Sequence, residues 1–556
     1  MRDEEKMKKI DWFIILFIII ISCIALRDLF RPGFYTSHDG IHQVVRLYYF
    51  DAALREGQFP PRWVGGLLNG FGYPLFIFSY HLPWLIAEPL HLFGLSIFDS
   101  IKMTFLIGFI LSGITMYIFQ KEIFGRGAAF VGSFLYLFAP YRFSNIFVRA
   151  AIGDATAFIF PPLLFLSLFK LRKENKLIWK WVILGAISLA GILLSHAMVF
   201  LFFFIAILLY IMYSLVFLKK RLKFLFASAL LIVFSFGVSA YYFIPSLMER
   251  NYTKFTEIMR SVFVGKTFLN LKELVYSPWG YGVMHAQEGG MSFQLGIAQW
   301  IVFVFSIGLL IFLVVKRKKK GNSILIRDMF FYIVLFIGSL GMMLPFSSPV
   351  WQVIQRFVVI DFTWRILPVT LFALSVLGGF LVSHISYSWV LASLLILLAI
   401  YGNRNHLKRN LTLDWPLSFY LQLEKTTNSY HEYTPKWVKE EAVEKQKPLI
   451  EFSIPEGEVK IQKANSSYVE FLVKTSQDGV VKLNKVYYPG WNVAVNGHNT
   501  PIQFENSGLI EFPVSPGTSK IIARFSETPL RLLSNFISIG TFLIMGYFWK
   551  KYQKNE

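Results

Sequence analysis

The sequence has little cysteine and little charge, and each shortage excludes a class of protein. Its 556 residues include one cysteine, Cys23, so the chain can build neither an internal disulfide framework nor a thiolate metal site. Charged residues make up 16% of the chain, whereas soluble globular proteins have about 25%. The composition therefore excludes a soluble cytosolic enzyme, a disordered chain and a small disulfide-rich secreted domain.

Apolar residues and an excess of basic residues dominate the chain instead. Hydrophobic residues make up 55% of it, and 55 Lys and Arg against 34 Asp and Glu give a net charge of +21. Such a charge can indicate a nucleic-acid partner, but here the basic residues stand in short runs between long apolar stretches. We therefore predict a mainly α-helical, polytopic protein of the cell membrane, in contact with the lipid bilayer and with no nucleic-acid partner.

The apolar stretches predict about 12 transmembrane helices, since a span needs about 20 mostly apolar residues. Basic runs between them, such as those at 219–223 and 316–320, mark the cytoplasmic face. Both termini are then cytoplasmic and the remaining loops are extracytoplasmic. The predicted spans lie at 11–27, 102–119, 127–143, 155–170, 181–196, 198–217, 224–246, 293–315, 328–345, 366–383, 388–402 and 530–549.

Two other apolar features need a separate interpretation. Residues 75–97 contain Pro83, Glu88 and Pro89, and a span there would move every later basic run to the outside. We predict a juxtamembrane or re-entrant pair of helices for this segment. The N-terminus resembles a signal peptide but lacks a convincing small-residue cleavage site, so we expect an uncleaved first span.

A change of composition predicts an extracytoplasmic β-rich domain near the C-terminus. Val469, Phe471 and Val473 alternate with polar residues, and Asn496-Gly497 between two such runs is a strong hairpin signal. Short strands with Gly and Pro turns favour a β-sandwich or jelly roll. The predicted division is a transmembrane domain at 1–402 with a large first outer loop at 28–101, the β-rich domain at 403–528, and a final helix with a basic cytoplasmic tail at 529–556.

The first outer loop contains a group of ionisable residues just beyond the predicted membrane exit. His38, Asp39 and His42 come first, and Arg46 and Arg62 follow. Ionisable groups near membrane depth are costly, so each is a functional candidate. Asp39 can face both the lipid boundary and water, and the histidines can orient it or complete a metal site. The alternative is a solvated loop with ordinary charges.

Five further ionisable residues fall on the same predicted face: Arg142, Arg149, Asp154, His196 and Arg365. Arginine suits phosphate, because its planar donors match phosphate oxygens. Structural alternatives exist for each type. Asp154 can cap a helix or pair with Arg149, His196 can be an ordinary buried polar residue, and Arg365 can snorkel to the interface.

The gathering of these residues on one face favours a membrane enzyme that handles an anionic, lipid-linked substrate outside the cell. A flippase or transporter of lipid-linked sugars has the same composition, but places its charges more often at the middle of its spans. A non-catalytic scaffold for assembly of the cell envelope is the other alternative. These three classes stay open on the residues alone.

Several motifs resemble a bacterial and archaeal membrane family labelled 6-pyruvoyl-tetrahydropterin-synthase-related. The resemblance covers nearly the whole chain and lies more in the order of the motifs than in any one of them. The family is similar to the GT-C glycosyltransferase superfamily, whose members generally use a sugar on a polyprenyl phosphate as donor. The matching motifs are His38-Asp39-Gly40, Arg55 to Trp63, Asn69 to Phe76, Tyr141-Arg142, Val148 to Asp154, Ser195-His196, Trp364-Arg365, His431 to Pro435 and Tyr487 to Trp491.

The resemblance implies transfer of a sugar from a polyprenyl phosphate to an extracytoplasmic acceptor, with inversion. Asp39 matches the acidic position of the family's first outer loop and would be the general base, with His38 and Asp154 as further catalytic residues. A single Asp39 replaces the adjacent acidic pair of the mannosyltransferases, and the outer domain lacks a WWD-type signature, which argues against protein N-glycosylation. The basic residues expected to bind substrate or phosphate are His42, Arg46, Arg62, Arg142, Arg149, His196 and Arg365.

A divalent cation, Mg²⁺ or Mn²⁺, is a further possibility that the resemblance leaves open, because GT-C enzymes differ in this respect. No cofactor is certain from the sequence. If a metal binds, its expected ligands come from His38, Asp39, His42 and Asp154.

Overall fold

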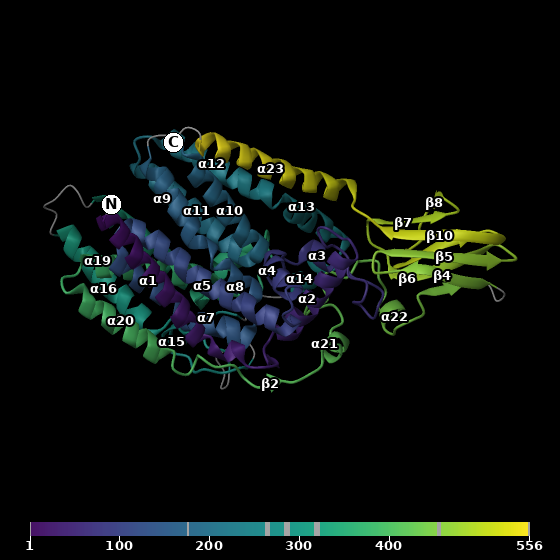
Figure 1. Ribbon diagram of the computed structural model, residues 1–556, viewed down its shortest axis with the longest axis horizontal. Helices are drawn as coiled ribbons and strands as arrows, with labels where there is room; N and C mark the ends of the chain where they lie inside the picture. Colours follow the sequence, from purple (N-terminus) through teal and green to yellow (C-terminus); the bar gives the residue numbers. More distant parts are fainter. Residues whose placement is uncertain are drawn as a thin grey trace.

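A computed structural model describes residues 2–174, 177–261, 267–282, 290–315, 323–452 and 457–553. Most of the chain forms an elongated bundle of helices, the helical body (Figure 1). Two β-sheets, the β body (450–525), extend from one end of this bundle, and the two chain termini lie at its other end. One end of the molecule therefore consists of β-sheets, and the other consists of helices and carries the chain termini.

Seven helical stretches within the described residues are long and apolar enough to cross a membrane, judged by length and composition. A bent pair, Leu325–Gly341 with Pro345–Ile354, is an eighth candidate whose halves meet at 87°. The seven are α5 (Ile97–Phe124), Ile152–Lys173 (α8 with α9), α11 (Ala197–Phe217), α12 (Arg221–Val238), α16 (Ile297–Val315), Thr363–His384 (η7 with α19) and α23 (Pro529–Gln553).

Several predicted spans are shorter or broken in the structure. α6 (Arg126–Leu137) has 12 residues, about 18 Å at 1.5 Å per residue, against a hydrocarbon core of about 30 Å. It ends early because Pro140 begins a separate short helix. α10 (Trp179–Ser195) and α20 (Ser388–Gly402) are also short. Length and composition thus identify seven or eight spans among the described residues, and the predicted total of about 12 stays a prediction.

The segment predicted as the first outer loop folds into short helices that pack into the core of the helical body. α2 (Gly40–Arg55) contacts α5, α4 (Leu82–Leu92) and α21 (Leu417–Leu423). Residues 75–97 contain α3 (Leu75–Phe78) and α4, a pair of short helices as the prolines predict. None of these helices is long enough to span a membrane, and they lie at the end of the helical body next to the β body (Figure 1).

Residues that follow the predicted domain boundary at 403 lie on the helical body rather than among the sheets. β2 (Thr412–Leu413) pairs antiparallel with β1 (Phe34–Tyr35), with Leu413 opposite Phe34. Tyr420 of α21 is buried in the core of the helical body. This long-range pairing carries the chain at 424–433 back over α2.

The β body consists of two antiparallel sheets with one shared hydrophobic cluster. Val469, Phe471 and Val473 are buried in it, as their alternation predicts. The five-stranded sheet has the order β4 (Glu458–Ala464), β5 (Tyr468–Thr475), β10 (Gly517–Phe525), β7 (Trp491–Val495) and β8 (His498–Thr500), and the three-stranded sheet has the order β3 (Ile450–Phe452), β6 (Gly479–Val486) and β9 (Leu509–Val514).

The hairpin predicted at Asn496-Gly497 is confirmed. It joins β7 to β8, with Val495 paired to His498, and both turn residues have positive φ, 51° and 86°. Positive φ at both central residues is the requirement of a type I′ turn, which Asn-Gly meets at low cost.

The first outer loop and the last helix fasten the β body to the helical body. Trp63 of the loop packs with Trp491 and Phe525 of the sheets, at ring-centroid distances of 5.7 and 5.1 Å. Arg531 at the start of α23 forms a two-pronged ion pair with Glu249, at 2.8 and 2.7 Å. Both partners of this pair are buried.

Candidate active site

A cavity of about 590 Å³ lies where the first outer loop meets the helical body. Its volume is typical of a small-molecule site. Charged and aromatic side chains from distant parts of the sequence line it together. The contributing segments include 38–46, 78–80, 149–153, 196–198, 361–365 and 427–433.

Asp39 stands at the start of α2, on the cavity wall. Its backbone N–H donates to the carbonyl of Arg149 and that of His38 to the carbonyl of Val148, both at 2.9 Å. The Asp39 side chain does not cap the helix, and within the described residues its carboxylate has no hydrogen bond or ion pair. A Cβ at Gly40 would lie 2.3 Å from Ser37 Oγ and 2.7 Å from Phe34 Cε1, so a larger residue would displace both side chains. The backbone is thus fixed while the carboxylate is free.

His38 lies beside Asp39 as a neutral donor. Burial lowers the pKa of His38, and the charge of Arg149 lowers it further, against the opposing effect of Asp39. Its Nε2 lies 3.1 Å from the carbonyl oxygen of Gly282, so this nitrogen carries the proton and donates. The imidazole therefore holds a fixed tautomer next to the free carboxylate.

Asp154 sits behind the cavity wall and connects two cationic or polar side chains. Its Oδ2 accepts from Arg149 Nη1 at 2.6 Å, and its Oδ1 lies 3.3 Å from His196 Nε2. His196 Nδ1 accepts from the Met198 N–H at 3.3 Å, and the Arg365 Nη1 lies 3.3 Å from His196 Nε2. Asp154 is buried and bonded to Arg149 through Oδ2, whereas its Oδ1 has no hydrogen-bond partner among the described residues.

Two arginines are fixed on the cavity wall. Arg149 also contacts the Tyr141 hydroxyl at 3.2 Å, and its guanidinium lies 4.8 Å from the ring centroid of Trp364. Asp361 holds Arg365 with two bonds of 2.7 Å. Both arginines line the cavity, so their positive charges are oriented before any ligand enters.

Residues 427–433 form a cavity wall, and the segment 424–433 is bonded directly to α2. Arg46 donates to the Thr427 carbonyl at 2.5 Å, and His42 Nδ1 lies 2.8 Å from Glu424 Oε1. Asn428 donates to one carboxylate oxygen of Glu432 at 3.0 Å. The other oxygen of Glu432 is buried with no hydrogen-bond partner among the described residues. This wall thus adds a third carboxylate to the cavity, beside those of Asp39 and Asp361.

Most of the residues predicted for the site come together, and two do not. His38, Asp39, His42, Arg46, Arg149, His196 and Arg365 line the cavity, with Asp154 directly behind it. Arg62 instead bonds to Glu527 and Asn535 at the junction with α23, at 3.0 and 3.1 Å. Arg142 lies inside the bundle, 3.9 Å over the ring of Phe158, and donates to Ser112.

Several residues of the site could not be predicted from the sequence. Glu432 and Tyr433 lie in the His431-to-Pro435 motif, but nothing local indicates that this motif returns to the first outer loop. Tyr433 stacks on Phe78 at 4.6 Å, which brings the two together. Asp361 is different, because it lies in the same ionisable stretch of the sequence as Arg365, four residues before it, and pairs with it. Glu424 has no sequence signal of this kind.

The residues named as possible metal ligands do not fit a metal in this arrangement. Across the described ranges, no group of three or more His, Cys, Asp or Glu side chains is placed to hold an ion. Asp154 is bound by Arg149, His42 by Glu424, and His38 faces a carbonyl. A divalent cation stays an untested prediction, and we derive no step through one.

Comparisons with known proteins give distant similarities. No protein-family model matches the chain, so the family resemblance of its motifs stays a prediction. An uncharacterized protein of Lactococcus lactis subsp. cremoris is 24% identical over 255 residues, which is 44% of this chain and 41% of that protein. The chain therefore matches less than half the length of this curated relative.

Solved structures similar to this one are membrane glycosyltransferases. The mycobacterial arabinofuranosyltransferase AftD matches 71% of this chain and 27% of its own length, with a TM-score of 0.47 and 12% identity. ArnT of Cupriavidus metallidurans, solved with undecaprenyl phosphate, matches 73% and 67%, with a TM-score of 0.45 and 14% identity. The oligosaccharyltransferase of Archaeoglobus fulgidus matches 76% and 60%, with a TM-score of 0.42 and 12% identity. At this level of similarity, roles for the cavity residues have to come from the cavity's own geometry.

Proposed function

We propose that the cavity is the active site of a membrane glycosyltransferase that moves a sugar from a polyprenyl-phosphate donor to an acceptor hydroxyl outside the cell. The supporting observation is the contrast between its acidic residues. The Asp39 carboxylate has no partner among the described residues, while Asp154 and Asp361 are engaged by arginines in the same wall. One free base beside two fixed cations suits transfer away from a phosphate.

In the proposed reaction, Asp39 takes the proton of the acceptor hydroxyl as its oxygen attacks the anomeric carbon. A new carbon–oxygen bond forms to the acceptor, and the bond from the anomeric carbon to the phosphate oxygen breaks. Both electrons of that bond leave with the lipid phosphate. Arg149 and Arg365 stabilise the negative charge that develops there. Direct displacement inverts the anomeric configuration.

The neighbouring residues have supporting roles in this proposal. Neutral His38 flanks the base without placing a competing positive charge next to it. Asp154 orients Arg149 and His196 from behind the wall. Arg46 and His42 fasten the 424–433 segment to α2, which limits the space open to the acceptor. Polyprenyl phosphate as the donor carrier rests on the resemblance of the sequence motifs.

The test is sugar transfer by the purified full chain in vesicles, from a panel of radiolabelled polyprenyl-phosphate sugars to envelope acceptors. We compare wild type with Asp39→Asn and with Asp478→Asn, which makes the same change at an exposed turn of the β body. The proposal expects transfer by wild type and Asp478→Asn, and a loss of about 100- to 10,000-fold in Asp39→Asn, the usual contribution of a general base.

Two results contradict the proposal in different ways. Normal transfer by Asp39→Asn would overturn the assignment of the base while leaving the enzyme class intact. Movement of a lipid-linked sugar across the vesicle membrane, with no transfer from any donor of the panel, would instead establish a transporter.

A further inference from the structure

A second pocket lies at the end of the helical body that carries the chain termini. It has a volume of about 240 Å³ and lies between the last turns of α9 (Phe160–Lys173) and α11 and the start of α17 (Ser323–Gly341). We call it the basic pocket. The residues that line it include Arg172, Lys173, Tyr213, Phe217, Arg327 and Asp328. The active-site cavity adjoins the opposite end of α11, at Ala197 and Met198, a helix length of about 30 Å away.

The basic pocket carries an excess of positive charge. Arg172 and Asp328 form a two-pronged, mostly buried ion pair, which neutralises both. Lys173 and Arg327 are exposed at the rim, and neither has an ion-pair partner among the described residues. The nearby Glu122 is paired with Lys170. The positive charges of Arg172, Lys173 and Arg327 therefore exceed the single negative charge of Asp328. The pocket suits a ligand group with one or two negative charges.

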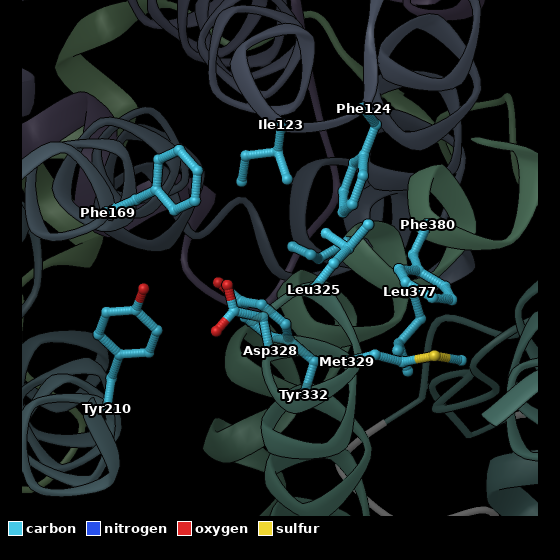
Figure 2. A pocket seen from close by; sticks show the side chains of 11 residues that line it. Ile123, Phe124, Phe169, Tyr210, Leu325, Asp328, Met329, Tyr332, Leu377 and Phe380 are labelled. Atoms are coloured by element: carbon cyan, nitrogen blue, oxygen red, sulfur yellow. The ribbon is translucent and has the colours of Figure 1, made fainter. Parts of the chain in front are cut away.

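The inner end of the pocket is closed by apolar packing. Asp328 also lines a space of about 10 Å³, enclosed by side chains such as Phe169, Phe380 and Leu377, which is too small for more than a water molecule. Figure 2 shows the Asp328 carboxylate turned toward the hydroxyl of Tyr210, below the ring of Phe169. A ligand can therefore enter the basic pocket only as far as the ion pair.

The surface beside the pocket indicates that its ligand carries apolar chains. Leu209, Met212 and Val216 follow the i, i+3, i+7 spacing of one helix face on α11, and all three are exposed, Met212 by 64% and Val216 by 62%. Phe217, also exposed, adds an aromatic ring at the pocket wall, 4.4 Å from the Arg327 guanidinium. A free anion would make no use of this apolar stripe.

We propose that the basic pocket binds the phosphate of an anionic phospholipid, with Lys173 and Arg327 contacting the headgroup and the acyl chains lying along the α11 stripe. Basic pockets between membrane helices recognise such headgroups. The bound lipid fixes the helical body at the membrane face that carries the termini. This site is independent of the sugar-transfer site and does not rest on the function proposed for it.

The test is native mass spectrometry of the purified full chain in mild detergent, titrated with phosphatidylglycerol or with phosphatidylcholine of the same acyl chains. We compare wild type, the double variant Lys173→Gln/Arg327→Gln, and Lys180→Gln. Lys180 is an exposed lysine near the same face, stacked 5.1 Å from the Trp181 ring and outside the pocket.

We expect wild type and Lys180→Gln to retain phosphatidylglycerol in preference to phosphatidylcholine. The double variant should bind phosphatidylglycerol on the order of 30-fold more weakly, because each basic residue at a membrane surface contributes about fivefold. Equal retention of the two lipids by wild type, or equal behaviour of the two variants, would overturn the proposal. Inorganic phosphate that binds through Lys173 and Arg327 with no lipid preference would identify a free-anion site instead.

Discussion

Asp39 and Asp154 show how two carboxylates of one site take opposite roles through their surroundings. Asp39 has a fixed backbone and a free side chain, whereas Asp154 is buried between Arg149 and His196. A base must be free to accept a proton, and a carboxylate that holds an arginine at 2.6 Å is committed to it. We therefore propose Asp39 as the base and Asp154 as a residue that positions Arg149.

Replacement of Asp154 by Asn should lower kcat on the order of 100-fold, because Arg149 and His196 lose their orientation. The pH–rate profile should keep its wild-type shape, since the base is still present. Steady-state transfer kinetics across pH measure both effects. A profile that loses its acid limb in Asp154→Asn but keeps it in Asp39→Asn would reverse the two assignments.

His38 should make the fold less stable at acid pH. Burial holds the pKa of His38 below 6.5, the usual value in the unfolded chain, so below that pH the unfolded chain binds more protons and stability falls as the pH is lowered. We expect His38→Gln to lose less thermal stability than wild type between pH 7.5 and 5.5. Thermal unfolding at both pH values measures the difference. A parallel decline in the two proteins would mean that His38 is not buried as a neutral group.

Many residues of the candidate site could be predicted from the sequence, but the side chains that they contact could not. Asp39, Arg149, His196 and Arg365 were predicted for one site because they share a predicted membrane face. Arg62 and Arg142 share that face as well, yet the first bonds to Glu527 and the second is buried among aromatic rings. Position along a span does not reveal which way a side chain points.

At the scale of elements, local signals predicted local structure. The Asn496-Gly497 turn needs only its own residues to adopt positive φ, and it formed where predicted. The return of residues 424–433 to α2 depends instead on the pairing of β1 with β2 and on the packing of Tyr433 against Phe78. Such contacts join residues far apart in sequence, so no local pattern predicts them.

The 424–433 segment should contribute to substrate binding through Glu432, whose second oxygen is buried without a partner among the described residues. Sugar hydroxyls are suitable donors to that oxygen. We expect Glu432→Gln to raise KM about tenfold, the cost of a charge-assisted hydrogen bond, with kcat changed less. Gln keeps an acceptor for Asn428, so the wall should stay folded. An unchanged KM for both donor and acceptor would contradict this role.

At the scale of the whole molecule, a buried ion pair joins its two parts. Arg531 and Glu249 are 0% and 2% exposed, and they link α23 and the β body to the helical body. Glu249→Gln leaves the Arg531 charge unpaired and should destabilise the fold by about 3–5 kcal/mol. Thermal unfolding of the detergent-solubilised protein measures this.

The double variant Glu249→Gln/Arg531→Met removes the unpaired charge of Arg531 and should recover much of the lost stability. If Glu249→Gln unfolds at the wild-type temperature, the pair does not hold the two parts together. A double variant less stable than Glu249→Gln would show that Arg531 contributes through contacts other than this pair, such as its bond to the Pro489 carbonyl.

Release of the lipid phosphate itself is the most direct measurement of the proposed sugar transfer. A polyprenyl-phosphate sugar labelled with radioactive phosphorus is supplied to the full chain in vesicles together with acceptor, and free polyprenyl phosphate is separated and counted. We expect wild type to release polyprenyl phosphate only when acceptor is present, and we expect Asp39→Asn to lose this release. Labelled donor that stays intact in the presence of every acceptor would contradict the proposed sugar transfer.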